Sequence, residues 1–403
     1  MSDASISPAA ALPKRILLPL AFVNFTIGAG AFLVLGLLAP ITESLSLTKA
    51  QAGWVMGAYA LAYAISSPIV IAMTGAWARR SVILTGLGLF VAGSLVSAIA
   101  ASAATLYAAR IVVAVGAGMT TPVAAAIAVA ISRPETRGAA LSFVFVGMTM
   151  AQVLGVPAAA FIGYTFGVPT AFVLAASLGA LMMVWIALAV PRDVQFQPQS
   201  LATLGRTLLS PPHLVAVLLT VTIATSGYLG ITFMGPLAEY RLNMGRDGVA
   251  LILGAGGFGA VVGNLLSGKL VDRLGPSGAL LFFIAGQALV LPALTLIPFN
   301  LPVGMFLSFL WNLVGWGFTV PQQARLMAID PQTQGVMLAL NAAGIYLGSG
   351  IGSALAGAVY QSWGIEATGV VGGAIAALAI VHLFVSDWLI RRWRSDPGPT
   401  VAP

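Results

Sequence analysis

Cysteine is absent from this 403-residue sequence, and charged residues make up only 7% of it. The first absence excludes disulfide bonds and thiol chemistry. The second excludes an ordinary soluble domain, in which about 25% of residues are charged. Because the two histidines, His213 and His382, lie far apart in the sequence, we expect no metal site, and we expect no cofactor.

The residues that are abundant are apolar or small. Hydrophobic residues make up 59% of the chain, 46 residues are glycine, and the mean hydropathy is +1.00. This is more apolar surface than a soluble core of this size can bury, so lipid must be the solvent. The apolar runs are long and continuous, which predicts helices and excludes a porin-like barrel. The fold class is therefore an all-α integral membrane protein.

Taking about 20 apolar residues as one crossing, the sequence predicts twelve transmembrane helices. Six are expected near 16–41, 51–74, 81–100, 104–131, 138–164 and 168–190, and six more near 213–236, 249–269, 278–299, 302–326, 334–360 and 367–389. The prediction divides the chain into a tail (1–15), a six-helix bundle (16–190), a linker (191–212), a second six-helix bundle (213–390) and a tail (391–403).

Lys and Arg residues predict how these helices are oriented. With the N-terminus in the cytoplasm, the outer loops receive only Lys49, Arg241 and Arg246, whereas nearly all other basic residues fall in cytoplasmic loops. We therefore expect a multi-pass protein of the bacterial plasma (inner) membrane with both termini cytoplasmic. The net charge of +7 reflects this orientation and not nucleic-acid binding, because the basic residues are isolated or paired. We expect a monomer in the lipid bilayer.

An internal repeat relates the two sets of helices. GAGMTTP at 116–122 is echoed by GWGFTVP at 315–321, with glycine, threonine and proline in register. Downstream, Pro134, Gly138, Gly147 and Gly155 recur as Pro331, Gly335, Gly344 and Gly352. Linked matches in the same order indicate duplication. Two repeated helix bundles are a transporter architecture in which the substrate is held near the midplane between them.

Three segments carry a resemblance to a known family: GKLVDRLG at 268–275, LYAARIVVAVGAG at 106–118 and GMTMAQVLGVPAAAFIG at 147–163. They resemble motifs of the major facilitator superfamily, in particular its drug, arabinose and chloramphenicol exporters. The resemblance implies two pseudo-symmetric six-helix bundles and alternating access. It also implies secondary active export of a small organic solute, such as a drug, sugar or metabolite, by proton antiport that can confer drug resistance.

The same resemblance implies gating residues. Gly268, Asp272, Arg273 and Gly275 form the loop that latches the cytoplasmic side in the family, and Gly155 and Pro157 belong to the bendable fifth span. The alternative for the loop is an ordinary charged turn. The first-half copy, TGAWARRS at 74–81, departs from the pattern because Arg79 stands where the repeat has Asp272.

Polar residues inside the spans are the candidates for substrate binding. Arg110 lies about two turns inside the fourth span, where a guanidinium needs water, a partner or a substrate. The alternative is a structural arginine whose hydrogen bonds go to backbone carbonyls. The other leading candidates are Asn24, Tyr59, Tyr228, Asn312, Trp316 and Asn341, and Tyr63, Gln152, Thr225, Trp311 and Tyr346 also have polar groups at membrane depth. For each of these, an interhelical hydrogen bond or an interfacial aromatic is the competing interpretation.

None of the eleven acidic residues falls in the middle of a predicted span. Many relatives have a glutamate in the first span where this chain has Ala31, so an obvious proton carrier is missing. Glu43, Glu239 and His382 remain as proton-coupling candidates. Because the only deep charge is positive, we expect a neutral or anionic solute.

Two other functions compete with coupled export. An uncoupled facilitator or uptake carrier of a neutral or anionic solute has the same fold, since fold does not set direction. A membrane enzyme is a remote alternative, because it would need a nucleophile, paired acids or metal ligands at membrane depth. We therefore expect a transporter and no enzymatic activity.

Overall fold

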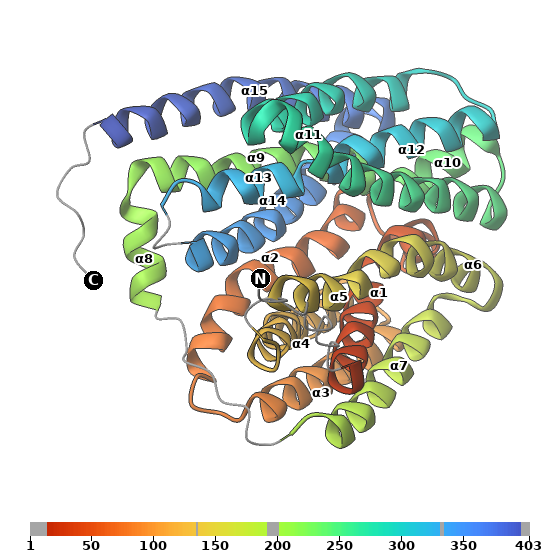
Figure 1. Cartoon of the computed structure of the whole chain (residues 1–403). Helices are drawn as coiled ribbons and strands as arrows, with labels where there is room; N and C mark the ends of the chain where they lie inside the picture. Colours follow the sequence, from red (N-terminus) through yellow and green to blue (C-terminus); the bar gives the residue numbers. More distant parts are fainter. Residues whose placement is uncertain (1–13, 134–135, 192–200, 331–333, 396–403) are drawn as a thin grey trace, which may run out of the picture.

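The computed structural model describes residues 14–133, 136–191, 201–330 and 334–395, and these residues are almost entirely helical (Figure 1). The predicted tails fall largely outside these ranges, as does the start of the predicted linker. The helices before the linker occupy the lower part of the view in Figure 1, and those after it occupy the upper part.

The first half of the chain makes six crossings. Its elements are α1 (Lys14–Ser44), α2 (Lys49–Met73), α3 (Arg79–Ala98), α4 (Ala103–Ala130), α5 (Arg137–Met150), the π-helical turn η2 (Ala151–Gly155), α6 (Val156–Phe166) and α7 (Val168–Ala189). α5, η2 and α6 follow one another without a break and form the fifth crossing.

The second half begins after α8 (Leu201–Leu209), a short helix inside the predicted linker. Its elements are α9 (Pro211–Ile231), α10 (Met234–Leu242), α11 (Arg246–Leu296), α12 (Leu301–Gly317), α13 (Thr319–Met327), α14 (Gln334–Trp363) and α15 (Ile365–Ser395). The described residues contain eleven helical stretches long and apolar enough to cross a membrane. One of them, α11, is two crossings joined at Gly275, whose φ of 71° breaks the helix. The twelve predicted helices are therefore confirmed.

The turns between helices contain residues suited to ending and starting helices. Thr48 caps α2 in a capping box with Gln51, and Ser102 caps α4. Gly167 and Gly364 both have a φ of 88°, a conformation that favours glycine. Gly167 lies between the fifth and sixth crossings, and Gly364 lies between the eleventh and twelfth. This shared turn extends the sequence repeat into the backbone.

The two halves meet at two main contacts. α2 packs against α14, and η2 and α6 pack against α11. Glycines allow the first pair to approach closely: a Cβ at Gly53 would lie 2.4 Å from the carbonyl oxygen of Ser353, and one at Gly357 would lie 2.8 Å from that of Lys49. The backbones of α2 and α14 are thus in direct contact, as small residues permit in membrane bundles.

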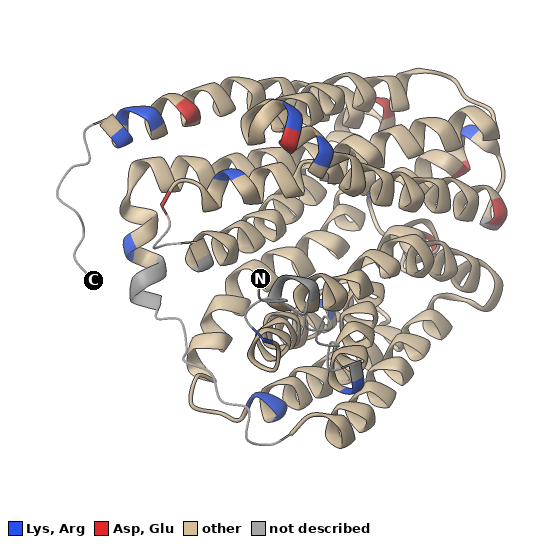
Figure 2. Ribbon diagram, in the orientation of Figure 1, with Lys and Arg blue, Asp and Glu red and all other residues tan. Residues whose placement is uncertain are grey.

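We name the two ends of the bundle according to their position relative to the linker. The linker end contains α8 and the turn at Gly275, and the distal end contains the α1–α2, α6–α7 and α14–α15 turns. Figure 2 shows that most Lys and Arg residues lie near the two ends of the bundle, whereas the stretches between these ends are almost free of charged residues. The exception within the helices is Arg110, which is 1% exposed.

Candidate functional site

A cavity lies between the two halves. We call it the central cavity. The elements that line it are α1, η2 and α6 from the first half, and α9, α10, α11 and α12 from the second. Its lining residues are Phe32, Leu35, Gln152, Val156, Ile231, Met234, Leu253, Gly257, Asn312 and Trp316.

A second cavity lies within the second half. We call it the side cavity. Ile231 and Trp316 line both cavities, so the two spaces adjoin. The other residues around the side cavity are Ile223, Ala224, Gly227, Tyr228, Trp311, Gly315, Phe318 and Ile345.

The π-helical turn η2 places Gln152 at the central cavity. Pro157 has no N–H, so the carbonyl group of Val153 loses its usual partner four residues ahead, and the helix widens just before the proline. Gly257 of α11 fits against this turn, because a Cβ there would lie 2.7 Å from the Cα of Val153. Such turns occur frequently at functional sites.

Asn312 is the second amide group of the central cavity. Its Nδ2 donates a hydrogen bond to the Ser308 carbonyl oxygen at 3.0 Å, and the Ser308 hydroxyl donates to the Ile252 carbonyl oxygen at 2.8 Å. A Cβ at Gly256 would lie 2.5 Å from the Asn312 Nδ2. The side chain is therefore fixed between α11 and α12, and its carbonyl oxygen has no partner among the described residues.

Aromatic rings border both cavities. Phe32 of α1 and Trp316 of α12 meet edge to face, with ring centroids 6.1 Å apart, and so connect the two halves across the central cavity. Trp311 lines the side cavity and is 2% exposed, and its Nε1 makes no hydrogen bond with any described residue. Tyr228 borders the same cavity.

Arg110 is held by the backbone of α1 and lines neither cavity. Its Nη1 donates to the Gly30 carbonyl oxygen at 2.8 Å, and its Nη2 donates to the Ala31 carbonyl oxygen at 3.0 Å. Its guanidinium carbon lies 4.5 Å from the centroid of the Tyr59 ring, a cation–π distance. These contacts give the buried charge partners without a carboxylate.

Tyr59 also belongs to an aromatic group at the interface between the halves. Tyr63, on the same helix α2, stacks on Tyr346 of α14 with centroids 3.7 Å apart. The ring centroid of Tyr59 lies 6.4 Å from that of Tyr346, and Tyr59 is fully buried. This group packs α2 against α14 near the middle of both helices.

The other candidate amides make hydrogen bonds between helices. Asn24 donates to the Val144 carbonyl oxygen at 3.2 Å and ties α1 to α5. Asn341 accepts from the Thr220 hydroxyl at 2.8 Å and ties α14 to α9. The structure thus brings Tyr228, Asn312 and Trp316 to the cavities, together with Gln152 and Trp311, and places Asn24, Arg110, Tyr59 and Asn341 elsewhere. Phe32 and Leu35 were not singled out, because an apolar residue in an apolar span carries no distinguishing signal.

The gating candidates occupy two places. Asp272 and Arg273 are exposed at the linker end and make no hydrogen bond or ion pair with another described residue. Gly268 and Gly275 flank them, and a Cβ at either would meet nothing within 4 Å. Gly155 packs on α1, where its Cβ would lie 3.3 Å from that of Ala29.

Two hydrogen bonds join the halves at the distal end, and we call them the distal contacts. Tyr164 of α6 donates to Glu239 Oε2 of α10 at 3.0 Å. The backbone N–H of Lys49, at the start of α2, donates to Gln361 Oε1 of α14 at 3.1 Å. Among the proton-coupling candidates, Glu239 is therefore the one at the interface.

The remaining two coupling candidates make no hydrogen bond between the halves within the described part of the chain. His382 of α15 is placed by α9, since its Nδ1 is 3.1 Å from the Thr222 hydroxyl and its Nε2 is 3.0 Å from the Val215 carbonyl oxygen. Glu43 is exposed at the distal end of α1.

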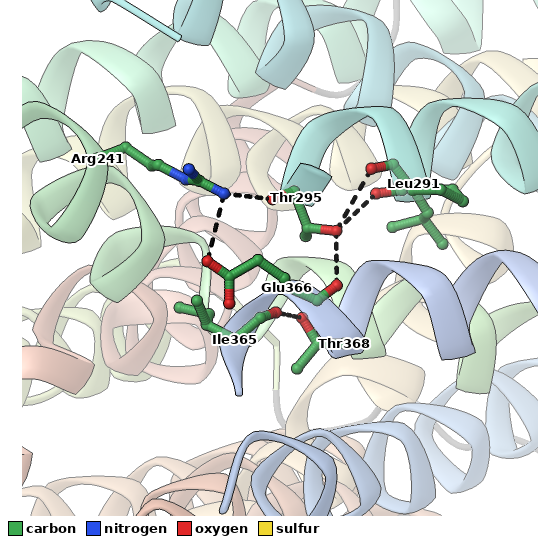
Figure 3. Close-up of polar contacts among 7 residues, drawn as sticks. Arg241, Leu291, Thr295, Ile365, Glu366 and Thr368 are labelled. Carbon is green, nitrogen blue, oxygen red and sulfur yellow. Dashed lines mark hydrogen bonds and ion pairs between the residues drawn. The ribbon is translucent and has the colours of Figure 1, made fainter. Parts of the chain in front are cut away.

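A polar cluster fixes the distal end of the second half (Figure 3). Arg241 Nη2 of α10 lies 3.3 Å from Glu366 Oε1 of α15 and donates to the Thr295 carbonyl oxygen of α11 at 2.7 Å. The Thr295 hydroxyl in turn donates to the Glu366 carbonyl oxygen at 2.9 Å. Three helix ends are thereby joined, and Glu239 lies two residues before Arg241 on the same short helix.

Two repeated helix bundles around a shared cavity define a membrane transporter. The chain belongs to the Major Facilitator Superfamily, whose family description matches residues 20–329. The resemblance found in the sequence is thereby confirmed at the level of the superfamily.

Named relatives and solved structures agree with this assignment. The inner membrane transport protein YdhP of Escherichia coli K12 is 29% identical over 92% of this chain and 95% of that protein. The MFS-type transporter YtbD of Bacillus subtilis is 30% identical over 94% and 97%. A bacterial homologue of the human lysosomal transporter Spinster, in an inward-facing conformation, is 19% identical and has a TM-score of 0.75 over 95% and 99% of the two chains. This last likeness shows the fold.

Proposed function

We propose that this protein is a secondary active transporter that exports a small organic solute across the bacterial cytoplasmic membrane by alternating access. The observation that carries the proposal is the central cavity, which both halves line and whose shape must change when they move relative to each other. The resemblance of residues 147–163 to the fifth-span motif of exporters supports the direction of transport. We propose a monomer as the working unit.

The linker end faces the cytoplasm in this proposal, and both termini are cytoplasmic. Arg79, Arg80, Arg206, Lys269, Arg273 and Arg391 lie at that end. A cytoplasmic excess of Lys and Arg is the general rule for membrane proteins. The distal contacts then close the outer side of the transporter in this conformation.

Exchange between the two conformations requires the distal contacts to break. Tyr164 and Glu239 lie on opposite halves, so a rocking motion that opens the outer side separates them. The loop at 268–275 acts in the opposite conformation. Asp272 has no described partner when the outer side is closed, and we propose that it engages the other half when the cytoplasmic side closes.

Proton coupling is assigned to Glu239 in this proposal. Of the three candidates, only its carboxylate makes a bond between the halves, so its protonation changes the relative free energies of the two conformations. His382 binds within the second half, and Glu43 is exposed. An uncoupled facilitator is the alternative if protonation of Glu239 has no such effect.

Solute efflux from proteoliposomes tests both parts. Vesicles loaded with a panel of neutral and anionic compounds are followed with and without an inward proton gradient, beside protein-free vesicles. Export accelerated by the gradient and lost in Glu239→Gln, but kept in the matched Glu43→Gln, supports coupling through Glu239. Equal efflux with and without the gradient makes the protein a facilitator, and no solute movement at all contradicts the transport proposal.

A further inference from the structure

The residues around both cavities include no Lys, Arg, His, Asp or Glu. The acidic residues of the described chain lie near the ends of the bundle, at Glu43, Glu239, Asp247, Asp272, Asp330, Glu366 and Asp387. No counter-ion is therefore available at membrane depth for a cationic solute. Moving a charge from water into an apolar cavity costs free energy, and without a partner of opposite charge most of that cost is not offset.

An anionic solute meets the same difficulty. The one deep cation, Arg110, is turned onto the backbone of α1 and the ring of Tyr59, and both terminal nitrogens already donate to carbonyl oxygens. It is 1% exposed and absent from the lining of both cavities. Its charge is thus not presented to the site as a salt-bridge partner.

What the site presents is rings and a few neutral hydrogen-bonding groups. Phe32 and Trp316 provide ring surfaces from opposite halves. Gln152 and Asn312 line the central cavity, and neither the Gln152 amide nor the Asn312 carbonyl oxygen has a partner among the described residues. The buried Nε1 of Trp311 is an unpartnered donor at the side cavity. An unpaired buried donor is costly, and an acceptor on a bound molecule would pair with it.

On the basis of the transport function proposed above, we infer that the site takes an uncharged molecule with a planar aromatic ring and a neutral carbonyl, sulfonyl or amide group. The ring packs against Phe32 and Trp316, and the polar group binds to Gln152, Asn312 or Trp311.

Three dansyl probes test the charge requirement directly: dansyl amide is uncharged, dansylglycine is anionic and dansylcadaverine is cationic at neutral pH. Binding to the full-length protein in detergent is measured by energy transfer from tryptophan to dansyl. We expect saturable binding of dansyl amide that is at least tenfold tighter than that of either charged probe. Equal or tighter binding of a charged probe would overturn the inference, as would the absence of saturable dansyl amide binding.

A negative charge introduced into the cavity lining should reverse the order of affinity between the uncharged and the cationic probe. In Asn312→Asp we expect dansylcadaverine to bind at least as tightly as dansyl amide, because the new carboxylate supplies the missing counter-ion. Gln152→Glu introduces the same charge at a half-buried position. It therefore keeps the test valid if Asn312→Asp, at a buried position, fails to fold. Asn243→Asp is the matched control, since Asn243 is exposed in the distal turn after α10. An unchanged order in both lining variants contradicts the assignment of the site.

This experiment separates the site from the transport proposal. Binding in detergent needs no gradient and has no direction, so dansyl amide that binds but is never moved in proteoliposomes would refute export and leave the site assignment in place. Transport of a charged solute with no competition from dansyl amide would refute the uncharged site and leave the transport proposal in place.

Discussion

The hydrogen bond from Tyr164 to Glu239 leads to a quantitative prediction about conformation. Tyr164→Phe removes the donor and keeps the ring, so the packing of α6 on α11 is preserved. A hydrogen bond to a charged group contributes about 1.5–3 kcal/mol. Both side chains are partly exposed, which lets water replace the bond in part, so the lower limit applies. About 1.4 kcal/mol corresponds to a tenfold change in an equilibrium constant.

We therefore expect Tyr164→Phe to raise the ratio of open to closed outer side about tenfold. The chain has no cysteine, so spin labels can be attached specifically to Ser44→Cys and Met244→Cys, one on each half at the distal end. Pulsed electron spin resonance then measures the distance distribution between them. The open conformation appears as a longer-distance component.

The control for this prediction is Tyr240→Phe, which removes an exposed hydroxyl from the same short helix as Glu239. It should leave the distance distribution unchanged. If Tyr164→Phe gives the same distribution as this control, the distal contact does not stabilise the closed outer side, and the reasoning is refuted.

Four further changes have expected outcomes. Gly257→Ala forces α11 away from η2 and should cost about 1–3 kcal/mol of stability, seen as a lower melting temperature, whereas Gly205→Ala, whose Cβ meets nothing, should not. Arg110→Met replaces a buried charge by an apolar chain of similar length and should keep or raise the melting temperature; a large loss of solute binding at unchanged stability would instead assign Arg110 to the solute. Asp272→Asn should slow solute counterflow without lowering the melting temperature, and normal counterflow would remove the loop from the gating mechanism. Glu366→Gln should cost less than about 1 kcal/mol in thermal unfolding, because the Glu366 side chain is 39% exposed in its pair with Arg241.

The sequence was sufficient for the fold. Apolar runs of membrane length located all twelve crossings, because in lipid each crossing must satisfy its own backbone hydrogen bonds as a helix. The gap between the predicted spans 249–269 and 278–299 contains the reversal that the structure places at Gly275. Pro157 was the local signal for the π-helical turn, although the sequence alone does not show that the turn faces α11.

The candidate site was predictable only in part. Asn312, Trp316 and Tyr228 were identified because polar and large aromatic residues stand out in an apolar helix. The role of Arg110 could not be decided, since its partners are backbone carbonyl oxygens of α1, and every residue has a carbonyl group. The distal contacts were missed for a related reason: Tyr164 and Glu239 lie far apart in the sequence, and only the packing of the halves brings them together.

The two halves contribute unequally to the central cavity. The second half supplies Ile231, Met234, Leu253, Gly257, Asn312 and Trp316, and also contains the whole side cavity, whereas the first half supplies Phe32, Leu35, Gln152 and Val156. A bound molecule would thus contact mainly the second half and stay with it during transport. The first half would move relative to both and open the site to one side of the membrane or the other. The residence time of the molecule would then depend on how readily the first half moves away, and selectivity would depend on the residues of the second half.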